Sequence, residues 1–342
     1  MAAVQAETET RTSGSDGKTM LAIVQEGTGS ADVLHLREVG RPALSDGRLL
    51  IRVRAASVNA LDWHTVHGGF LLTVIGKLMR QRDDPVRGVD LAGVVEAVGA
   101  NAGDLRPGDE VFGAGHGTFA EYATTTPPSV VRKPSALPFE QAATVGVAGL
   151  TALQGLRDHA GLKPGQRVLI FGAGGGVGTF AVQIAKALGA HVTAVTGPRN
   201  IDVVRALGPD ELIDYTKEDV RGGGRRFDAV LDIAATRSIG SLRRVLVPGG
   251  IYVQVGASKT GGWLGVFGRI IGLVVRSRLF KQRVVMYIAK TRQKDLLFLR
   301  ELIETGKLRP AIDRTYPLSE TREAVRYLGS GQARAKVVIT ID

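Results

Sequence analysis

Residues 169–180 read LIFGAGGGVGTF, which places five glycines among the seven positions from 172 to 178. An apolar run, RVLIF, precedes them, and four apolar residues follow at the spacing of one helix face: Ala181, Ile184, Ala185 and Leu188. A helix N-terminus offers free N–H donors and a partial positive charge, and residues without side chains let a pyrophosphate approach closely. Strand, glycine turn and helix in this order therefore predict a dinucleotide-binding turn.

The match to the fingerprint G-x-G-x-x-G is imperfect, because Ala173 stands where the first glycine belongs. The predicted cradle consists of Ala173, Gly174, Gly175, Gly176, Val177 and Gly178. The alternative is a glycine turn that serves only the packing of the helix on the strand. The run of alternating strands and helices around the motif favours the dinucleotide.

The next strand, HVTAVT, indicates which dinucleotide is bound. In the NAD form an acidic residue at the tip of this strand takes the ribose 2′-hydroxyl. Here the strand has no carboxylate at its tip, and the predicted contacts are Thr196, Gly197, Arg199 and Asn200. Arg199 is placed to meet a 2′-phosphate, which favours NADPH. Asp202 keeps NADH as the alternative, and Arg199 could instead be a solvated surface residue.

The chain is expected to form two domains after a disordered leader at 1–19. Short β-branched runs divided by Gly, Ser, Asp and Pro make 20–144 a strand-rich domain. Strands and helices alternate through 145–290, which predicts a doubly wound parallel sheet and an α/β fold class. The remaining 291–342 ends in a strand that is expected to return to the first domain.

Composition excludes several classes of function. The chain has 342 residues and a net charge of +11, but its basic residues are dispersed and only 5% of residues are aromatic, so no nucleic-acid partner is expected. It contains no cysteine, which removes disulfides, thiolate nucleophiles and cysteine-ligated zinc. The apolar stretch 263–275 is short and contains Arg269, so no membrane span is expected, and without a signal peptide we expect a cytoplasmic protein.

An ordered set of motifs resembles the medium-chain dehydrogenase/reductase superfamily, and within it the zinc-independent quinone oxidoreductase and ene-reductase branch. The set comprises IRVRAASVNALDW, GVDLAGVVEAVG, RPGDEVFG, AGLTALQGL, the glycine stretch and the closing KVVITID. The resemblance implies a GroES-like first domain, a Rossmann nucleotide-binding domain, an active site in the cleft between them and a homodimer. It also implies a small hydrophobic carbonyl or quinone substrate.

Zinc-dependent members of this family carry a cysteine in the first domain and a histidine after a glycine. The corresponding positions here hold Leu61 or Asp62, and Val89 after Gly88. An aliphatic side chain cannot bind a metal, so no zinc is expected. A different metal site from Asp62, His64, His67 and Asp90 is the alternative, although these residues form no complete ligand pattern.

Catalytic residues follow from the same resemblance. The branch motif Asn-x-x-Asp-x-(Tyr or Lys) reads Asn59-Ala60-Leu61-Asp62-Trp63-His64, which makes Asn59, Asp62 and His64 the candidates. Asn59 would donate a hydrogen bond near the substrate or the nicotinamide ribose, and Asp62 would orient or cap the loop. His64 would donate the proton, and the alternative for His64 is a structural or surface histidine. Ala60 and Gly146 stand where the branch often has proline. Further cofactor contacts implied by the resemblance are Thr151, Tyr215, Gly256 and Lys336.

Two questions stay open at this point. The segment 259–281 interrupts the nucleotide domain with apolar residues and three arginines, and it is interpreted as a lid or a dimer contact rather than a membrane-surface helix. The leading function is NADPH-dependent reduction of an activated C=C bond or a quinone. The alternative is an NADPH-binding protein with little turnover and a nucleic-acid-binding or regulatory role.

Overall fold

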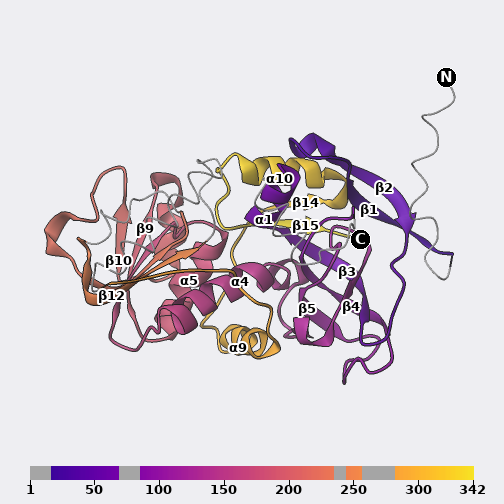
Figure 1. Cartoon of the computed structure of the whole chain (residues 1–342), viewed down its shortest axis with the longest axis horizontal. Helices are drawn as coiled ribbons and strands as arrows, with labels where there is room; N and C mark the ends of the chain where they lie inside the picture. The colour runs from indigo at the N-terminus through magenta and orange to yellow at the C-terminus, as the bar shows by residue number, and fades with distance from the viewer. Residues whose placement is uncertain (1–16, 69–84, 235–243, 256–281) are drawn as a thin grey trace. The chain divides into compact units, whose positions relative to one another are not determined.

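The computed structural model describes residues 17–68, 85–234, 244–255 and 282–342. Most of the predicted leader, Gly256 and the segment 259–281 lie outside the described residues. The chain forms two compact units (Figure 1). The strand-rich unit comprises 1–146, 314–332 and 337–342, and the nucleotide unit comprises 147–313 and 333–336.

The nucleotide unit is built on six parallel strands in the order β10-β9-β8-β11-β12-β13. Their bounds are β8 Arg167–Phe171, β9 His191–Thr196, β10 Glu211–Asp214, β11 Phe227–Asp232, β12 Leu246–Val255 and β13 Arg283–Tyr287. This order reverses between β8 and β11, which is the topological switch point where doubly wound sheets bind ligands. The predicted Rossmann sheet is confirmed.

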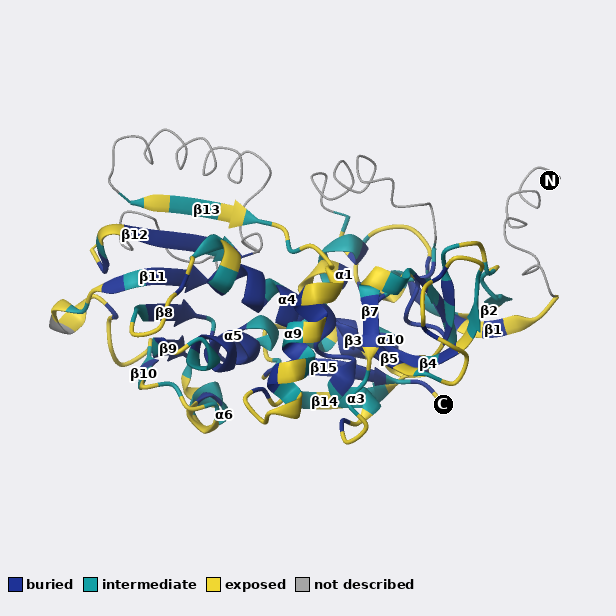
Figure 2. Ribbon diagram, turned by 90° about the horizontal axis from the view of Figure 1, so that it is seen from below, coloured by how far each residue is buried: buried dark blue, intermediate teal, exposed yellow. Residues whose placement is uncertain are grey.

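Helices accompany these strands along the chain, as the periodicity predicts. They are α4 Gly146–Leu153, the π-helix η3 Gln154–His159, α5 Gly176–Ala187, η4 Pro198–Asn200, α6 Ile201–Ala206, η5 Gly222–Gly224 and α9 Gln293–Glu304. Strands β8 and β9 are buried over almost their full length, because helices cover a parallel sheet on both faces. Figure 2 shows the contrast with the edge strand β13, which is partly exposed.

The strand-rich unit holds a seven-stranded sheet in the order β14-β15-β3-β4-β5-β7, with β6 also paired to β3. The bounds are β3 Leu49–Val58, β4 Asp90–Val98, β5 Glu110–Ala114, β6 Tyr122–Thr125, β7 Val130–Arg132, β14 Ile312–Pro317 and β15 Lys336–Thr340. A separate hairpin joins β1 Thr19–Gln25 to β2 Leu34–Gly40. The helices are η1 Ala31–Val33, α1 Ala60–Val66, η2 Pro127–Ser129, α3 Phe139–Ala142, η6 Leu318–Glu320 and α10 Thr321–Gly329. Strand β15 pairs antiparallel with β3, as expected of a C-terminal strand that returns to the first domain.

The return to the strand-rich unit begins at Arg314, whereas the sequence placed it at 291. The difference is α9, which the sequence assigned to the C-terminal segment. Side chains of the π-helix η3 hold α9 within the nucleotide unit: Gln154 donates to Asp295 at 2.9 Å, and Arg157 donates to Asp295 at 2.7 Å. Such long-range polar pairs leave no mark in the periodicity of either segment.

Candidate cofactor cradle and proton-donor site

The glycine turn follows β8 at the switch point of the parallel sheet. Gly172 has a φ of +77°, a conformation that glycine adopts readily. Ala173 has no such requirement, and its N–H donates to the carbonyl of Val195 at 3.1 Å. Gly172 therefore makes the tight turn, which explains how alanine is accepted in the place of the first fingerprint glycine.

The other glycines have different tasks. A Cβ on Gly178 would lie 2.1 Å from the carbonyl oxygen of Gly172, so this glycine allows α5 to pack closely on β8. A Cβ on Gly174 would lie 2.5 Å from the Cβ of Asn200, and one on Gly176 would lie 2.9 Å from the Cδ of Lys336. Gly175 is the open position, because the nearest atom would be 3.5 Å away.

Helix α5 begins at Gly176 with Gly175 as its N-cap. The cap makes no side-chain hydrogen bond, and the first turn contains no acidic residue. The first N–H groups of a helix have no partner within the helix and carry its positive dipole end. The N-terminus of this helix is therefore suited to an anion such as a pyrophosphate.

The loop after β9 carries the residues predicted to contact the adenosine end of the cofactor. Thr196 is buried at the end of the strand, and the ring of Tyr215 packs on Gly197, where a Cβ would lie 3.0 Å from the tyrosine oxygen. The Oδ1 atom of Asn200 is buried and accepts no hydrogen bond from the described residues. A buried polar atom without a partner is costly in a folded protein, so this atom fits a site that a bound polar group completes.

Arg199 and Asp202 are the two residues on which the predicted choice of dinucleotide depends: Arg199 favours NADPH, and Asp202 favours NADH. Arg199 is exposed on η4 and forms no ion pair with any residue that the structure describes. Asp202 pairs with Arg205 through a 2.6 Å contact in the first turn of α6. The carboxylate is thus engaged with a neighbouring arginine, whereas the guanidinium of Arg199 faces solvent.

Lys336 lies beside the cradle, although it is separated from Gly176 by most of the second half of the chain. The N–H of Ala335 donates to the carbonyl of Gly174 at 2.9 Å, which holds the start of β15 against the glycine turn. The side chain of Lys336 is buried, and its aliphatic part packs at Gly176. The structure therefore brings Lys336, the least expected of the predicted contacts, to the N-terminus of α5.

Thr151 lies on α4, and its hydroxyl donates to the carbonyl of Val147 at 2.6 Å. Its own carbonyl accepts a hydrogen bond from the hydroxyl of Tyr287, a residue of β13. Gly256 falls outside the described residues. The predicted cofactor contacts that the structure describes all lie in the nucleotide unit.

In the strand-rich unit, Asn59 and Asp62 form the start of α1. The side-chain amide of Asn59 donates to the carbonyl of Ser57 at 3.2 Å and to Asp90 at 2.9 Å. Asp62 accepts from the N–H of Asn59 at 2.7 Å, which caps the helix. Asp90 is fully buried and also accepts from the hydroxyl of Ser57 at 2.7 Å. The donor role predicted for Asn59 would thus require its amide to change partners.

His64 lies on α1 and is partly buried, with its ring edge-on to Trp63 at a centroid distance of 4.9 Å. The same Trp63 stacks on His67 at 4.1 Å.

Asp62 and Asp90 accept the hydrogen bonds described above, and no group of three or more metal-ligating side chains occurs in the part of the chain that the structure describes. None of the described helices is long and apolar enough to cross a membrane.

Sequence reasoning missed three features of these sites. It overlooked Gly172 as the turn residue, although the glycine directly precedes the motif. It considered Asp90 only as a metal ligand, whereas the structure shows it as the partner of Ser57 and Asn59. It did not identify Tyr287, for which the sequence carries no signal because the contact joins distant segments.

A parallel sheet with a glycine cradle at its switch point, together with a separate antiparallel unit, defines a two-domain protein of the dehydrogenase type. Comparisons with known families agree. Residues 45–135 match the family model of the alcohol dehydrogenase GroES-like domain, and residues 207–339 match that of the zinc-binding dehydrogenases.

Relatives that align over nearly the whole chain indicate which branch of the family it resembles. The chloroplastic quinone-oxidoreductase QR1 of Triphysaria versicolor is 30% identical over 338 residues, covering 94% of this chain and 99% of that protein. A 2-methylene-furan-3-one reductase of Solanum lycopersicum is 32% identical over 352 residues, covering 98% of this chain and 82% of the relative. The solved quinone oxidoreductase from Coxiella burnetii superposes with a TM-score of 0.82 at 32% identity, covering 95% of this chain and all of that one.

The chain belongs to the medium-chain dehydrogenase/reductase superfamily, and it is related to the quinone oxidoreductases and ene-reductases within it. It has a GroES-like domain and a Rossmann-like domain, as the sequence predicted. The family implies a nicotinamide dinucleotide as the cofactor.

Proposed function

We propose that the protein is an NADPH-dependent, zinc-independent reductase that transfers hydride to a quinone or to the activated C=C bond of a small hydrophobic carbonyl compound. The observation that carries the proposal is the cradle at the switch point. It combines an open glycine at position 175, a helix N-terminus whose cap makes no side-chain hydrogen bond, and a buried amide oxygen of Asn200 that accepts no hydrogen bond from the described residues. Relatives named for both reactions support the substrate classes.

The preference for NADPH is supported by the tip of β9. Arg199 is exposed there and forms no ion pair with the described residues, whereas Asp202 is held by Arg205. A guanidinium recognises a phosphate through charge-assisted hydrogen bonds, and no carboxylate of η4 competes for it. Tyr215 and Asn200 would complete the surroundings of the 2′-phosphate and its ribose.

The proposed chemistry divides between the cofactor and the chain. When bound, the reduced nicotinamide supplies a hydride. The chain must hold the cofactor, which we assign to the glycine cradle and Lys336, and it must deliver a proton. We assign the proton to His64, because an imidazolium donates hydrogen bonds and titrates near neutral pH. Asp62 caps the helix that carries this histidine, so its role is positional.

We infer that the reaction needs no zinc. Leu61 or Asp62, and Val89, occupy positions where zinc-dependent relatives have ligands, and the aliphatic side chains among them cannot bind a metal. The carboxylates nearest to those positions, Asp62 and Asp90, accept hydrogen bonds from Asn59 and Ser57. A homodimer and a cytoplasmic location remain predictions from the sequence.

The direct test is to follow oxidation of NADPH and of NADH in the presence of a panel of quinones and enones. Saturable oxidation of NADPH supports the proposal. Tight binding of NADPH without turnover of any panel member would favour the alternative of a nucleotide-binding regulatory protein. Equal use of both coenzymes would contradict the assignment of Arg199.

Replacing Arg199 by alanine should raise the KM for NADPH by about 10- to 100-fold, because charged hydrogen bonds to the 2′-phosphate are worth roughly 1.5–3 kcal/mol. The KM for NADH should stay the same, since NADH lacks that phosphate. Arg205→Ala is the matched control, because Arg205 is a nearby arginine that pairs with Asp202. An equal loss for both coenzymes in the R199A variant would show that Arg199 does not select the phosphate.

Replacing His64 by phenylalanine should lower kcat by about 100-fold and leave the Kd for NADPH unchanged, because the change removes a proton donor from the strand-rich unit. His67→Phe is the control. Position 67 lies at the C-terminal end of the same helix, and a phenylalanine ring there can still stack on Trp63. Steady-state kinetics and NADPH fluorescence titration give the two constants. A rate within twofold of the wild type would remove His64 as the acid.

A further inference from the structure

The helix that begins at Gly146 changes its hydrogen-bond pattern partway along. It is α-helical to Leu153 and π-helical over the six residues from Gln154 to His159. A π-helical segment is rare, and such segments occur frequently at functional sites. The change begins three residues after Thr151, the predicted nicotinamide contact.

The inserted group is the hydroxyl of Tyr287. It donates to the carbonyl of Thr151 and lies close against the backbone of Gly155. In an α-helix the N–H of Gly155 would donate directly to the carbonyl of Thr151. The tyrosine hydroxyl thus bonds to the carbonyl that this α-helical hydrogen bond would use.

Glycine at position 155 makes the insertion possible. A Cβ there would lie 2.5 Å from the Tyr287 oxygen and 3.0 Å from the Cδ1 of Leu231. The ring of His159, at the end of the π-helical segment, lies 4.3 Å from the Tyr287 ring. Burial raises the pKa of the Tyr287 hydroxyl, so it stays protonated and keeps its donor.

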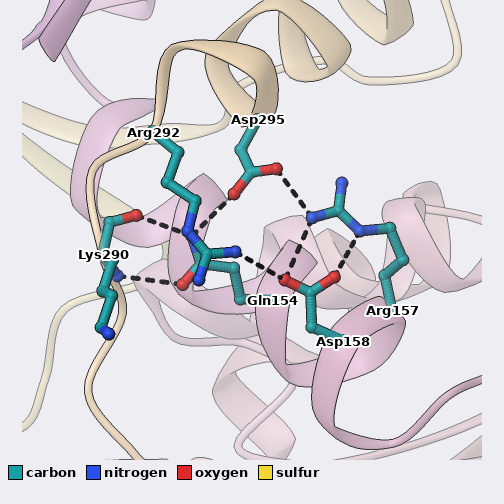
Figure 3. Close-up of polar contacts among 6 residues, drawn as sticks. All are labelled: Gln154, Arg157, Asp158, Lys290, Arg292 and Asp295. Atoms are coloured by element: carbon teal, nitrogen blue, oxygen red, sulfur yellow. Dashed lines mark hydrogen bonds and ion pairs between the residues drawn. The ribbon is translucent and has the colours of Figure 1, made fainter. Parts of the chain in front are cut away.

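The segment that follows Tyr287 holds the π-helix from a second direction (Figure 3). The amide of Gln154 donates to the carbonyl of Lys290 at 2.6 Å, and the N–H of Lys290 donates back to Gln154 at 2.9 Å. Gln154 and Arg157 both donate to Asp295, which is fully buried. We call these four residues and Tyr287 the helix clamp. The π-helical register is therefore fixed by the connection from β13 to α9.

We propose that Tyr287 is a positioning residue, which sets the register of α4 and thereby aims Thr151 at the nicotinamide. This inference rests on the proposed function. Successive residues of an α-helix are turned by about 100°, so a change of register rotates the face that α4 presents. The Thr151 hydroxyl is itself bonded to Val147, so its direction follows the helix. The glycine cradle is a separate element and should bind the rest of the cofactor as before.

The test is the full-length variant Tyr287→Phe, which keeps the ring and removes the hydroxyl. We expect kcat to fall about tenfold while the Kd for NADPH stays within threefold. The fluorescence emission of bound NADPH, which reports the surroundings of the nicotinamide, should move toward that of the free coenzyme. Gly155→Ala approaches the same contact from the helix side and should reproduce both changes, and the double variant should be no worse than either single variant.

Arg292→Ala is the matched control. It removes a 3.4 Å ion pair with Asp158 on the same π-helix and leaves the hydroxyl of Tyr287 in place, so kcat and emission should not change. If Y287F behaves like R292A while the wild type turns over NADPH, the positioning role is wrong and the proposed function stands. If the wild type binds NADPH without turnover, the proposed function fails. The positioning role is then tested by fluorescence alone: a shift of the bound-NADPH emission in Y287F supports it, and an unchanged emission contradicts it. A wild type that binds no NADPH overturns both.

Discussion

Replacing Gly178 by alanine is expected to abolish measurable NADPH binding and to lower the free energy of unfolding of the nucleotide unit by about 3 kcal/mol. The added Cβ would lie 2.1 Å from the carbonyl oxygen of Gly172 and 2.7 Å from the Cα of Ala173. Both are backbone atoms, so no side chain can move aside. Helix α5 must then shift away from β8, and this outweighs the gain of about 1 kcal/mol that alanine brings to a helix.

Gly175→Ala provides the control for this variant. A Cβ there meets nothing closer than 3.5 Å, and the φ of −89° suits any residue, so stability should stay within about 0.5 kcal/mol. NADPH binding should nevertheless weaken, because the methyl group would stand where the pyrophosphate approaches. Urea denaturation and fluorescence titration separate the two effects. If G178A binds NADPH as well as the wild type, or if G175A loses no affinity, the assignment of tasks to the glycines is wrong.

Replacing Asp295 by alanine is expected to lower the free energy of unfolding of the nucleotide unit by about 3–5 kcal/mol. The carboxylate is fully buried and accepts from Gln154 at 2.9 Å and from Arg157 at 2.7 Å. The hydrogen bond to Asp158, and to a lesser extent the one to Asp295, raises the pKa of the Arg157 guanidinium. Because Asp158 is still present in the D295A variant, Arg157 remains charged there. The substitution removes one of the two carboxylates that pair with the Arg157 guanidinium, and it removes an acceptor of the buried Gln154 amide.

Asp202→Ala is the comparison for the buried carboxylate. Asp202 also pairs with an arginine, at 2.6 Å, but its side chain is 94% exposed, and a pair in water contributes little. Its removal should change stability by about 0.5 kcal/mol or less. Thermal or urea denaturation of both variants gives the comparison. A loss of under 1 kcal/mol for D295A would show that water reaches the helix clamp and replaces the carboxylate.

The sequence predicted the elements whose periodicity is local. The glycine stretch and the alternating strands and helices were enough to predict the Rossmann sheet, and the ordered motifs were enough to predict the family. Periodicity reports which face of an element is buried, but it does not report which distant residue covers that face. Strand β15 could be expected to return to the first domain, yet nothing in KVVITID places Lys336 against Gly176.

The candidate site was harder to predict because polar pairing depends on the folded path of the chain. Asn59 looks like a free donor in the sequence, whereas in the structure its amide is held by Asp90 and Ser57. The helical spacing of AGLTALQGL gives no sign that Tyr287 changes its register from α to π. The identity of a residue fixes what it can donate or accept, and only the tertiary structure fixes the partner.

The pairing of Val337 with Val58 has a consequence for how the protein assembles. These two residues are 279 positions apart in a chain of 342 residues, so joining them in an unfolded polypeptide costs the conformational entropy of a very large loop. Residues 147–313, by contrast, form one compact unit together with 333–336. Once this unit has folded, the flexible loop between the two strands is much shorter, and the entropy cost of pairing them is smaller. We therefore expect completion of the antiparallel sheet to be a late event, after the middle of the chain has folded.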